Sequence, residues 1–290
     1  MKAMQNADDI AALVGRMPDA DESGKESKFT GPESTEADKV FASILAGGRD
    51  SILALVSLVK DAGDPTYKDF RPQYVLHGLA LMAGKPGNDA MRRLFAEAVG
   101  EALLAKGLSI EVQLMLVREL QIAGGKESVP ALARLLGDEN LALAQAMALE
   151  AIGAPAAEEL RSALPRAQGR RRTGIVQALG HLRDVAAVPM LKEIAVDKND
   201  ADARMAATWA LAAIGDSEAA GVILRGMGAE DPWERSRTLK AVFLLGENLE
   251  AAGKKELAKH LYLQLLATAK DPKDGYIREA IEQRMKAIGV

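Results

Sequence analysis

The chain has 290 residues, of which 48% are hydrophobic and 4% aromatic, and its formal net charge is −4 at pH 7. It contains no cysteine, which excludes disulfides and thiolate metal sites, and no apolar run approaches the ~18–20 residues that a membrane span needs. The N-terminus lacks the charged segment, apolar segment and cleavage site of a signal peptide, so we expect the cytoplasm, with export inside a longer protein as the alternative.

The first 35 residues differ in composition from the rest of the chain. Residues 1–37 carry four basic and eight acidic side chains. Asn6–Val14 can form two turns of helix, whereas Pro18–Thr35 is rich in Asp, Glu, Ser, Gly and Pro, a composition typical of a mobile linker. We therefore expect residues 1–35 to be an acidic flexible leader with a short helix. The leader is either solvated, which we favour, or docked on a groove or a partner.

Residues 36–290 form the second predicted region, in which apolar residues recur at helical spacing and strand patterns are absent. A lone entry helix is expected at 36–47. Seven helix pairs follow, at 50–62 with 69–84, 88–106 with 109–124, 127–137 with 139–153, 156–168 with 169–180, 185–197 with 201–215, 217–228 with 232–246, and 249–270 with 275–289. The final pair is expected to cap the stack at its C-terminal end, the alternative being that the chain is part of a longer protein.

One pattern recurs in these pairs and is clearest at 200–216. Asp200 can cap a helix, Ala207, Leu211 and Ile214 form one apolar stripe, and Gly215 supplies the positive φ that ends many helices. A glycine is expected to end each helical run, at Gly84, Gly124, Gly153, Gly180, Gly215, Gly246 and Gly289. Fifteen residues before five of these glycines stands an aspartate that we predict to be a cap: Asp69, Asp138, Asp200, Asp231 and Asp274. Repetition at spacings of this size indicates stacked units that bury their faces on one another.

At these residues the chain resembles the HEAT repeat family. The resemblance rests on Asp200-x-x-Ala-Arg, on Ala-Leu-x-x-Ile-Gly-Asp ending at Asp216, and on the helix openings Val188-Pro189 and Val129-Pro130. The subtype is the short bacterial one also found in bilin-lyase subunits. The likeness is good over 127–247, fair at 274–289 and weak at 49–124. It implies a right-handed α-solenoid of about seven antiparallel helix pairs, whose second helices line a concave, armadillo-like surface.

Eleven residues before three of the glycines stands an arginine: Arg204, Arg235 and Arg278. The resemblance implies that each bonds the aspartate of a neighbouring repeat and so builds a structural ladder. The alternative is a ligand site, which we favour less.

The sequence offers no catalytic centre. Its histidines, His77, His181 and His260, lie far apart and none precedes a glutamate, so we predict no metal site, no cofactor and no metal catalysis. Gly226-Met-Gly228 lacks the strand and the lysine of a phosphate loop. We therefore expect a protein that is not an enzyme.

Two sets of residues are predicted to bind a partner. Positions counted back from each glycine place Met205, Trp209, Lys240 and Phe243 on the concave face as an apolar patch beside a cation, although Trp209 can equally fill a gap between helices. Arg170, Arg171 and Arg172 form the one dense basic cluster. With a sequence pI of about 5.6 and no basic stripe on neighbouring repeats, this cluster favours an acidic protein over nucleic acid, or else is a solvated helix end.

These observations predict a soluble, monomeric scaffold that binds a protein or peptide on its concave face. Two alternatives stay open, a bilin-lyase-like enzyme subunit and, with less support, a HEAT-like protein that binds or repairs DNA.

Overall fold

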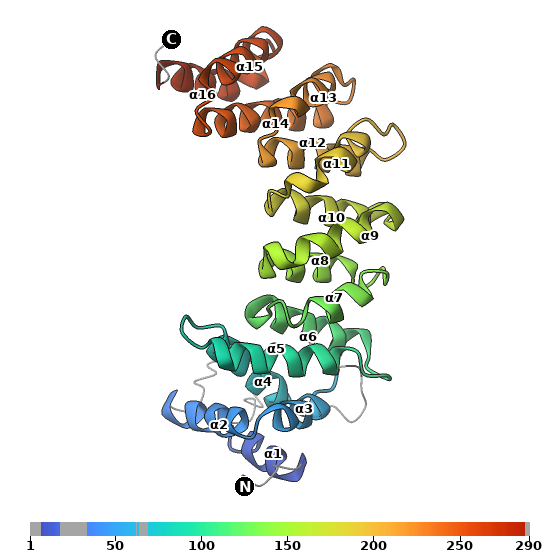
Figure 1. The fold of residues 1–290 in the computed structure, drawn as a ribbon, viewed down its shortest axis with the longest axis vertical. Helices are drawn as coiled ribbons and strands as arrows, with labels where there is room; N and C mark the ends of the chain where they lie inside the picture. The colour runs from blue at the N-terminus through green and yellow to red at the C-terminus, as the bar shows by residue number, and fades with distance from the viewer. Residues whose placement is uncertain (1–6, 18–33, 62, 64–68, 288–290) are drawn as a thin grey trace. The chain divides into compact units, whose positions relative to one another are not determined.

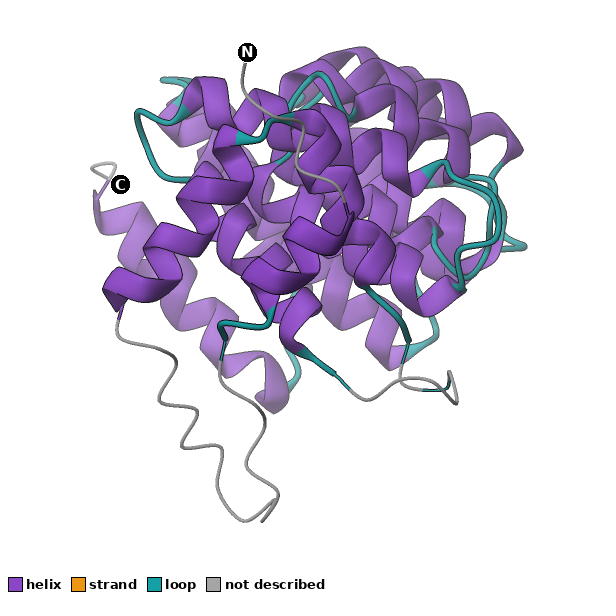
Figure 2. Cartoon of the chain, turned by 90° about the horizontal axis from the view of Figure 1, so that it is seen from below, coloured by secondary structure: helices purple, strands orange, loops and turns teal. Residues whose placement is uncertain are grey.

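The computed structural model describes residues 7–17, 34–61, 63 and 69–287. This part of the chain consists of α-helices, short 3-10 helices and the turns between them, without a strand (Figure 2). The prediction of an all-α fold is therefore confirmed. The chain divides into two compact units, Met1–Ala156 and Ala157–Val290, and each is described by itself.

The first unit holds two single helices and three helix pairs (Figure 1). The single helices are α1 (Ala7–Val14) and α2 (Ser34–Ala46). The pairs are α3 (Arg49–Leu58) with α4 (Arg71–Ala83), α5 (Asp89–Leu103) with α6 (Ile110–Ala123), and α7 (Val129–Leu135) with α8 (Ala142–Ile152), followed by the 3-10 turn η1 (Ala154–Ala156). The second helices α4, α6 and α8 contact one another in chain order, as the first helices α3, α5 and α7 do. This two-row packing is that of an α-solenoid.

Helix α1 is part of the first unit's core. It forms where the sequence predicted a short helix, and it contacts α2, α3 and α4. Its residues Ile10 and Val14 are buried, as is Met17 just after it. The N-terminal helix is thus packed rather than carried on a free arm. The predicted linker Pro18–Thr35 lies outside the described residues up to residue 33, after which α2 begins.

The second unit contains four helix pairs. They are α9 (Ala157–Ala163) with α10 (Gly169–His181), α11 (Val188–Ile194) with α12 (Ala201–Ile214), α13 (Ala220–Arg225) with α14 (Pro232–Ala251), and α15 (Lys255–Thr268) with α16 (Gly275–Ala287). The 3-10 turns η2 (Leu164–Arg166), η3 (Val185–Ala187), η4 (Ser217–Ala219), η5 (Gly226–Gly228) and η6 (Pro272–Asp274) lie between or beside these helices. Helix α12 packs between α10 and α14. The seven predicted pairs are therefore present, whereas the right hand of the superhelix stays a prediction.

Helix α12 shows how the local sequence builds such a unit. The Asp200 carboxylate accepts a hydrogen bond from the Ala203 amide at 3.0 Å, and Gly215 ends the helix at φ +80°. Ala207 and Leu211 are fully buried. Because most buried side chains of α12 are alanines, both neighbouring second helices can approach it closely.

Four of the recurring glycines follow the last residue of a helix, as predicted, at Gly84, Gly124, Gly153 and Gly215. Two do not. Gly180 and Gly246 lie inside α10 and α14. A Cβ on Gly180 would come within 2.7 Å of Ala210 and Trp209, and one on Gly246 within 2.4 Å of Tyr262. These two glycines allow close helix packing, so their prediction as helix stops was wrong. Gly289 lies outside the described residues.

The end of α14 also differs from the prediction. The helix continues past Gly246 to Ala251, and Gly253, at φ +77°, provides the turn into α15 at Lys255. The helix predicted at 249–270 therefore begins at Lys255, six residues after its predicted start. A buried glycine and a terminal glycine look alike in the sequence, and only the packing of Tyr262 distinguishes them.

Within the described residues, no single helix is both long and apolar enough to cross a bilayer. The helices 36–46 and 49–58 meet that test only when taken together, and a bend of 119° separates them.

Candidate functional site

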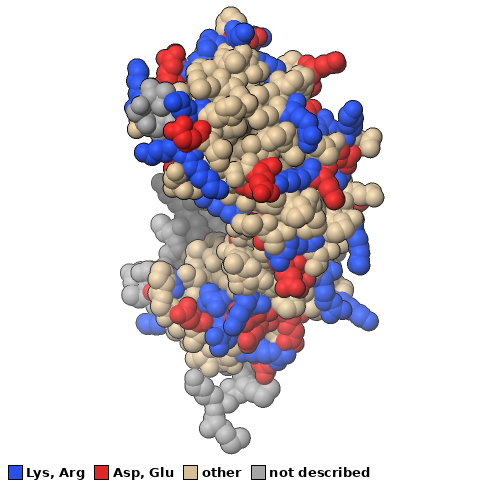
Figure 3. Space-filling view, turned by 45° about the horizontal axis from the view of Figure 1, so that its top comes forward, with Lys and Arg blue, Asp and Glu red and all other residues tan. Residues whose placement is uncertain are grey.

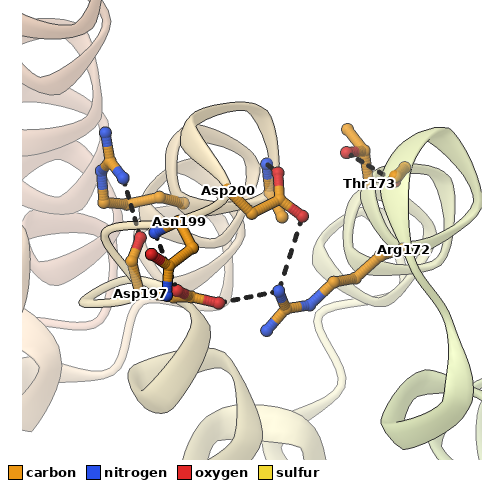
Figure 4. A network of polar contacts seen from close by, with 8 residues as sticks. Arg172, Thr173, Asp197, Asn199 and Asp200 are labelled. Atoms are coloured by element: carbon orange, nitrogen blue, oxygen red, sulfur yellow. Dashed lines mark hydrogen bonds and ion pairs between the residues drawn. The ribbon is translucent and has the colours of Figure 1, made fainter.

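A chain of ion pairs connects successive repeats of the second unit. Figure 4 shows its first member, Arg172 of α10, whose Nη1 lies 2.9 Å from Asp197 and 3.5 Å from Asp200. The backbone amide of Asn199 and Arg172 both donate hydrogen bonds to Asp197, and they hold the pKa of its carboxyl below the usual range. Arg172 is thus fixed against the turn that leads into the next second helix, α12.

The same arrangement continues along the second helices. Arg204 of α12 donates from Nε and Nη2 to the two carboxylate oxygens of Glu234, each at 2.7 Å, and these bonds lower the pKa of Glu234. Arg235 of α14 lies 2.8 Å from Asp274, whose side chain is only 7% exposed. Arg278 of α16 donates instead to the carbonyl oxygens of Ala269 and Asp271.

This geometry places the ladder arginines differently from the sequence prediction in three respects. Arg278 bonds backbone carbonyl oxygens and not the aspartate of a neighbouring repeat. Arg204 pairs with a glutamate one turn into α14, not with the cap Asp231. Arg172, assigned above to the partner-binding cluster, occupies the ladder position of α10, four residues after its N-cap Gln168, as Arg204 follows Asp200. A count back from the glycine does not identify Arg172, because fewer residues separate the cap from the glycine in α10 than in α12. Counting from the cap finds it.

The five predicted cap aspartates have different roles. Asp200 and Asp231 are N-caps that accept the amide hydrogens of Ala203 and Glu234. Asp69 accepts from the Arg71 amide and Asp138 from the Asn140 amide, each just before a helix. Asp274 lies in η6 and pairs with Arg235, while Asp271 is the N-cap there.

The predicted apolar patch separates into two packing contacts. Trp209, half-buried on α12, has its ring centroid 4.6 Å from that of His181 and lies against Gly180. Phe243, half-buried on α14, has its centroid 5.8 Å from that of Tyr262 on α15. The two rings therefore pack toward different neighbouring helices. Met205 is half-buried, and Lys240 is exposed.

Two of the three arginines of the basic cluster have partners within the protein. Arg171 donates to the carbonyl oxygen of Arg166 at 2.7 Å, and Arg172 belongs to the ladder. Arg170 is exposed at the start of α10. A cleft of about 540 Å³ lies beside this region, with Arg172, Glu193 and Asp197 among its lining residues. Because acids line it together with Arg172, it is not a purely basic site.

Four exposed side chains on α14 and α16 form what we call the aromatic–cationic strip: Trp233, Arg237, Lys240 and Tyr276. Trp233 is 63% exposed and Tyr276 49%. The Arg237 guanidinium lies 5.6 Å from the centre of the Trp233 ring, and the Lys240 ammonium lies 5.8 Å from that of Tyr276. At these distances each cation is attracted to the face of its ring.

The two cations of the strip differ from the ladder arginines in their partners. Among the described residues, no carboxylate lies within ion-pair distance of Arg237 or Lys240, whereas Arg204 and Arg235 are paired. Glu279, exposed one turn beyond Tyr276, is the acidic neighbour on α16. The strip therefore presents positive charge beside aromatic surface.

The sequence analysis found Lys240 but missed the rest of the strip. Trp233 and Tyr276 each stand thirteen residues before a recurring glycine. The positions counted back from each glycine in the sequence reached only ten residues, so they did not include these two rings. Trp233 follows its cap Asp231 by two residues, and Tyr276 follows Asp274 by two. A row counted from the aspartates would have placed both aromatic rings together.

The histidines are spread over separate contacts. His77 Nδ1 lies 3.1 Å from Glu119, His181 contacts Trp209, and His260 lies 3.1 Å from Gln264. In the part of the chain that the structure describes, no three His, Asp or Glu side chains are grouped to hold a metal ion.

Comparison with known proteins gave a match to one family model. A family model described as HEAT repeats matches residues 157–242. A search of curated proteins gave no match. A solved structure described as an engineered protein is 19% identical, with 82% of this chain and 97% of that chain covered, but at a TM-score of 0.31 it supports no argument. The matched residues include α9–α13 and the first part of α14, which carry Arg172, Arg204 and Arg235. Residues 157–242 therefore match a model of HEAT repeats, within an all-helical α-solenoid fold.

Proposed function

We propose that this protein is a non-catalytic scaffold whose second unit binds an acidic segment of a partner protein. The observation that carries the proposal is the aromatic–cationic strip, in which two unpaired cations lie on two exposed aromatic rings. Trp, Tyr and Arg are the residues that most often dominate binding energy at protein interfaces.

The chemistry of the strip favours one kind of partner. A carboxylate of the partner can accept hydrogen bonds from the Arg237 guanidinium while an apolar neighbour covers the Trp233 ring. Lys240 of α14 and Tyr276 of α16 repeat the same combination between two neighbouring second helices. A segment that alternates acidic with apolar or aromatic residues matches both halves of the strip.

The charges of the molecule favour a protein partner over nucleic acid. On the face drawn in Figure 3, lysine and arginine side chains are interspersed with acidic ones and do not follow one continuous stripe. Arg172 of the predicted basic cluster and the nearby Arg161 are each paired with an aspartate. Tracking a phosphate backbone needs several unpaired cations in a row, so the nucleic-acid alternative has less support.

The residues first predicted for this role keep a place in the proposal. Lys240 is a member of the strip, and exposed Arg170 can add long-range attraction for an acidic partner. Phe243 packs between α14, which carries most of the strip, and α15, whereas Met205 and Trp209 lie on α12. No specific observation favours a bilin-lyase-like activity.

The test is selection of peptides from a random library on the immobilised full chain. We expect the selected peptides to be acidic with aromatic or apolar residues. The double variant Arg237→Ala/Lys240→Ala should weaken their binding by about a hundredfold, and Trp233→Ala by about tenfold. Binding that weakens as salt increases would accompany this loss.

Arg225→Ala is the matched control, because Arg225 is exposed on α13, a first helix of the same unit. It should bind the selected peptides as the wild type does. Selection of basic or uncharged sequences, or equal binding by the double variant, would contradict the proposal.

A further inference from the structure

The first unit contains a cleft of about 590 Å³ between the second helices α4 and α6. This volume lies within the range of small-molecule sites in proteins. Its apolar lining includes Phe70, before the first turn of α4, and Met115 and Ile122 of α6. Ile122 is 40% exposed, so apolar surface is available to a ligand.

The charged and imidazole groups of the cleft are His77, Arg118 and Glu119, and Gln73, Tyr74 and Gln121 also line it. Glu119 is 7% exposed, and both its oxygens lie within 3.2 Å of His77 Nδ1. Burial raises the pKa of the Glu119 carboxyl, while the charges of His77 and Arg118 act against that rise. The only carboxylate among the lining residues is therefore withdrawn from the surface and already occupied by the imidazole.

Arg118 is the charge that the cleft presents. It is exposed, and no carboxylate of the described residues lies within ion-pair distance of its guanidinium. Since Nδ1 of His77 is committed to Glu119, Nε2 is the ring nitrogen left for a ligand. A guanidinium from α6 and an imidazole nitrogen from α4, with apolar side chains beside them, complement an anion attached to an apolar group.

We propose that this cleft binds a small organic acid in which a carboxylate adjoins an apolar ring. The carboxylate accepts hydrogen bonds from Arg118 and from Nε2–H of His77, which is a donor when the ring is doubly protonated or when the Glu119 carboxyl donates to Nδ1. The ring packs on Phe70, Met115 and Ile122. A cationic ligand fits less well, because Glu119 is buried and the exposed charge is positive. The proposal is independent of the aromatic–cationic strip, which lies in the other unit.

The experiment is calorimetric titration of the full chain with naphthylacetate. We expect binding that Arg118→Met weakens by about tenfold or more, and that Arg118→Lys weakens because the forked donor is lost. Naphthylacetamide, which keeps the ring and lacks the charge, should bind weakly. Glu119→Gln should bind naphthylacetate more tightly, since a nearby negative charge is removed while the side chain keeps its shape.

Arg134→Met is the matched control, because Arg134 is exposed on α7 of the same unit and does not line the cleft. It should leave naphthylacetate binding unchanged. Equal binding by Arg118→Met, or preference for naphthylmethylamine over naphthylacetate, would overturn the proposal. Binding of a peptide that ends in a free phenylalanine carboxylate, without binding of naphthylacetate, would also overturn it and point to a protein chain end.

Discussion

Arg235 is the ladder residue with the most deeply buried partner. Its substitution by alanine leaves Asp274, 7% exposed, without its cation, and we expect the free energy of unfolding to fall by about 2–3 kcal/mol. Chemical denaturation measures this loss. Affinity for peptides selected on the strip should not change.

The control is two residues away. Arg237→Ala removes an exposed arginine of the same helix that has no carboxylate partner, so stability should change by less than about 0.5 kcal/mol while peptide binding falls. If both variants lowered the free energy of unfolding equally, the effect of Arg235→Ala would come from lost side-chain packing and not from the lost ion pair.

Gln145 of α8 is a second residue with a predictable effect. It is fully buried, and neither its amide nitrogen nor its amide oxygen has a hydrogen-bond partner in the structure. Gln145→Met keeps a similar length without the polar atoms, so we expect the free energy of unfolding to rise by about 1 kcal/mol. Gln145→Glu should do the opposite, because it buries a carboxylate. A loss of stability in the methionine variant would mean that the amide is satisfied in solution.

At the scale of helices, the Arg204–Glu234 pair connects α12 to α14. Its bidentate bonds lower the pKa of Glu234, so the unfolded chain binds the proton more readily than the folded one. The stabilisation is therefore present above the ordinary carboxyl range and is lost as the pH falls through that range toward the lowered pKa. Unfolding of the wild type and of Arg204→Met/Glu234→Gln should differ most near neutral pH and least near about pH 3. A difference that stays constant with pH would show that the pair contributes through shape alone.

Gly180 determines how closely α10 and α12 can pack. Gly180→Ala places a methyl group within 2.7 Å of Ala210 and Trp209, so we expect a loss of about 1–3 kcal/mol and a change in tryptophan fluorescence. Gly221→Ala is the control. A Cβ on Gly221 would meet no packed neighbour within 4 Å, and the residue lies in helix α13, where alanine should be neutral or stabilising.

The sequence predicted the helices well because each depends on local signals. The apolar stripe and the caps at Asp200 and Asp231 act within a few residues, and the structure has helices where they indicated them. Gly180 and Gly246 show the limit of such signals, because their role depends on Trp209 and Tyr262 of other helices. The strip was missed for a related reason. The contact of Lys240 with Tyr276 joins two helices, and spacing within one helix does not determine it.

For the whole molecule, charge distribution decides between partner classes. The net charge is −4, and several arginines of the second unit are neutralised by their own repeats. We therefore expect the full chain to pass through a heparin column near physiological salt. The double variant Arg237→Ala/Lys240→Ala should elute at the same position. Retention that collapses with added salt would favour the nucleic-acid alternative.

The ladder has a direction along the chain. Each arginine precedes its acid, Arg172 by 25 residues from Asp197, Arg204 by 30 from Glu234, and Arg235 by 39 from Asp274. On the ribosome, which makes proteins from the N-terminus, every one of these cations emerges before the anion that will neutralise it. Each of these repeats therefore carries an unpaired arginine in the nascent chain until the next repeat has been translated.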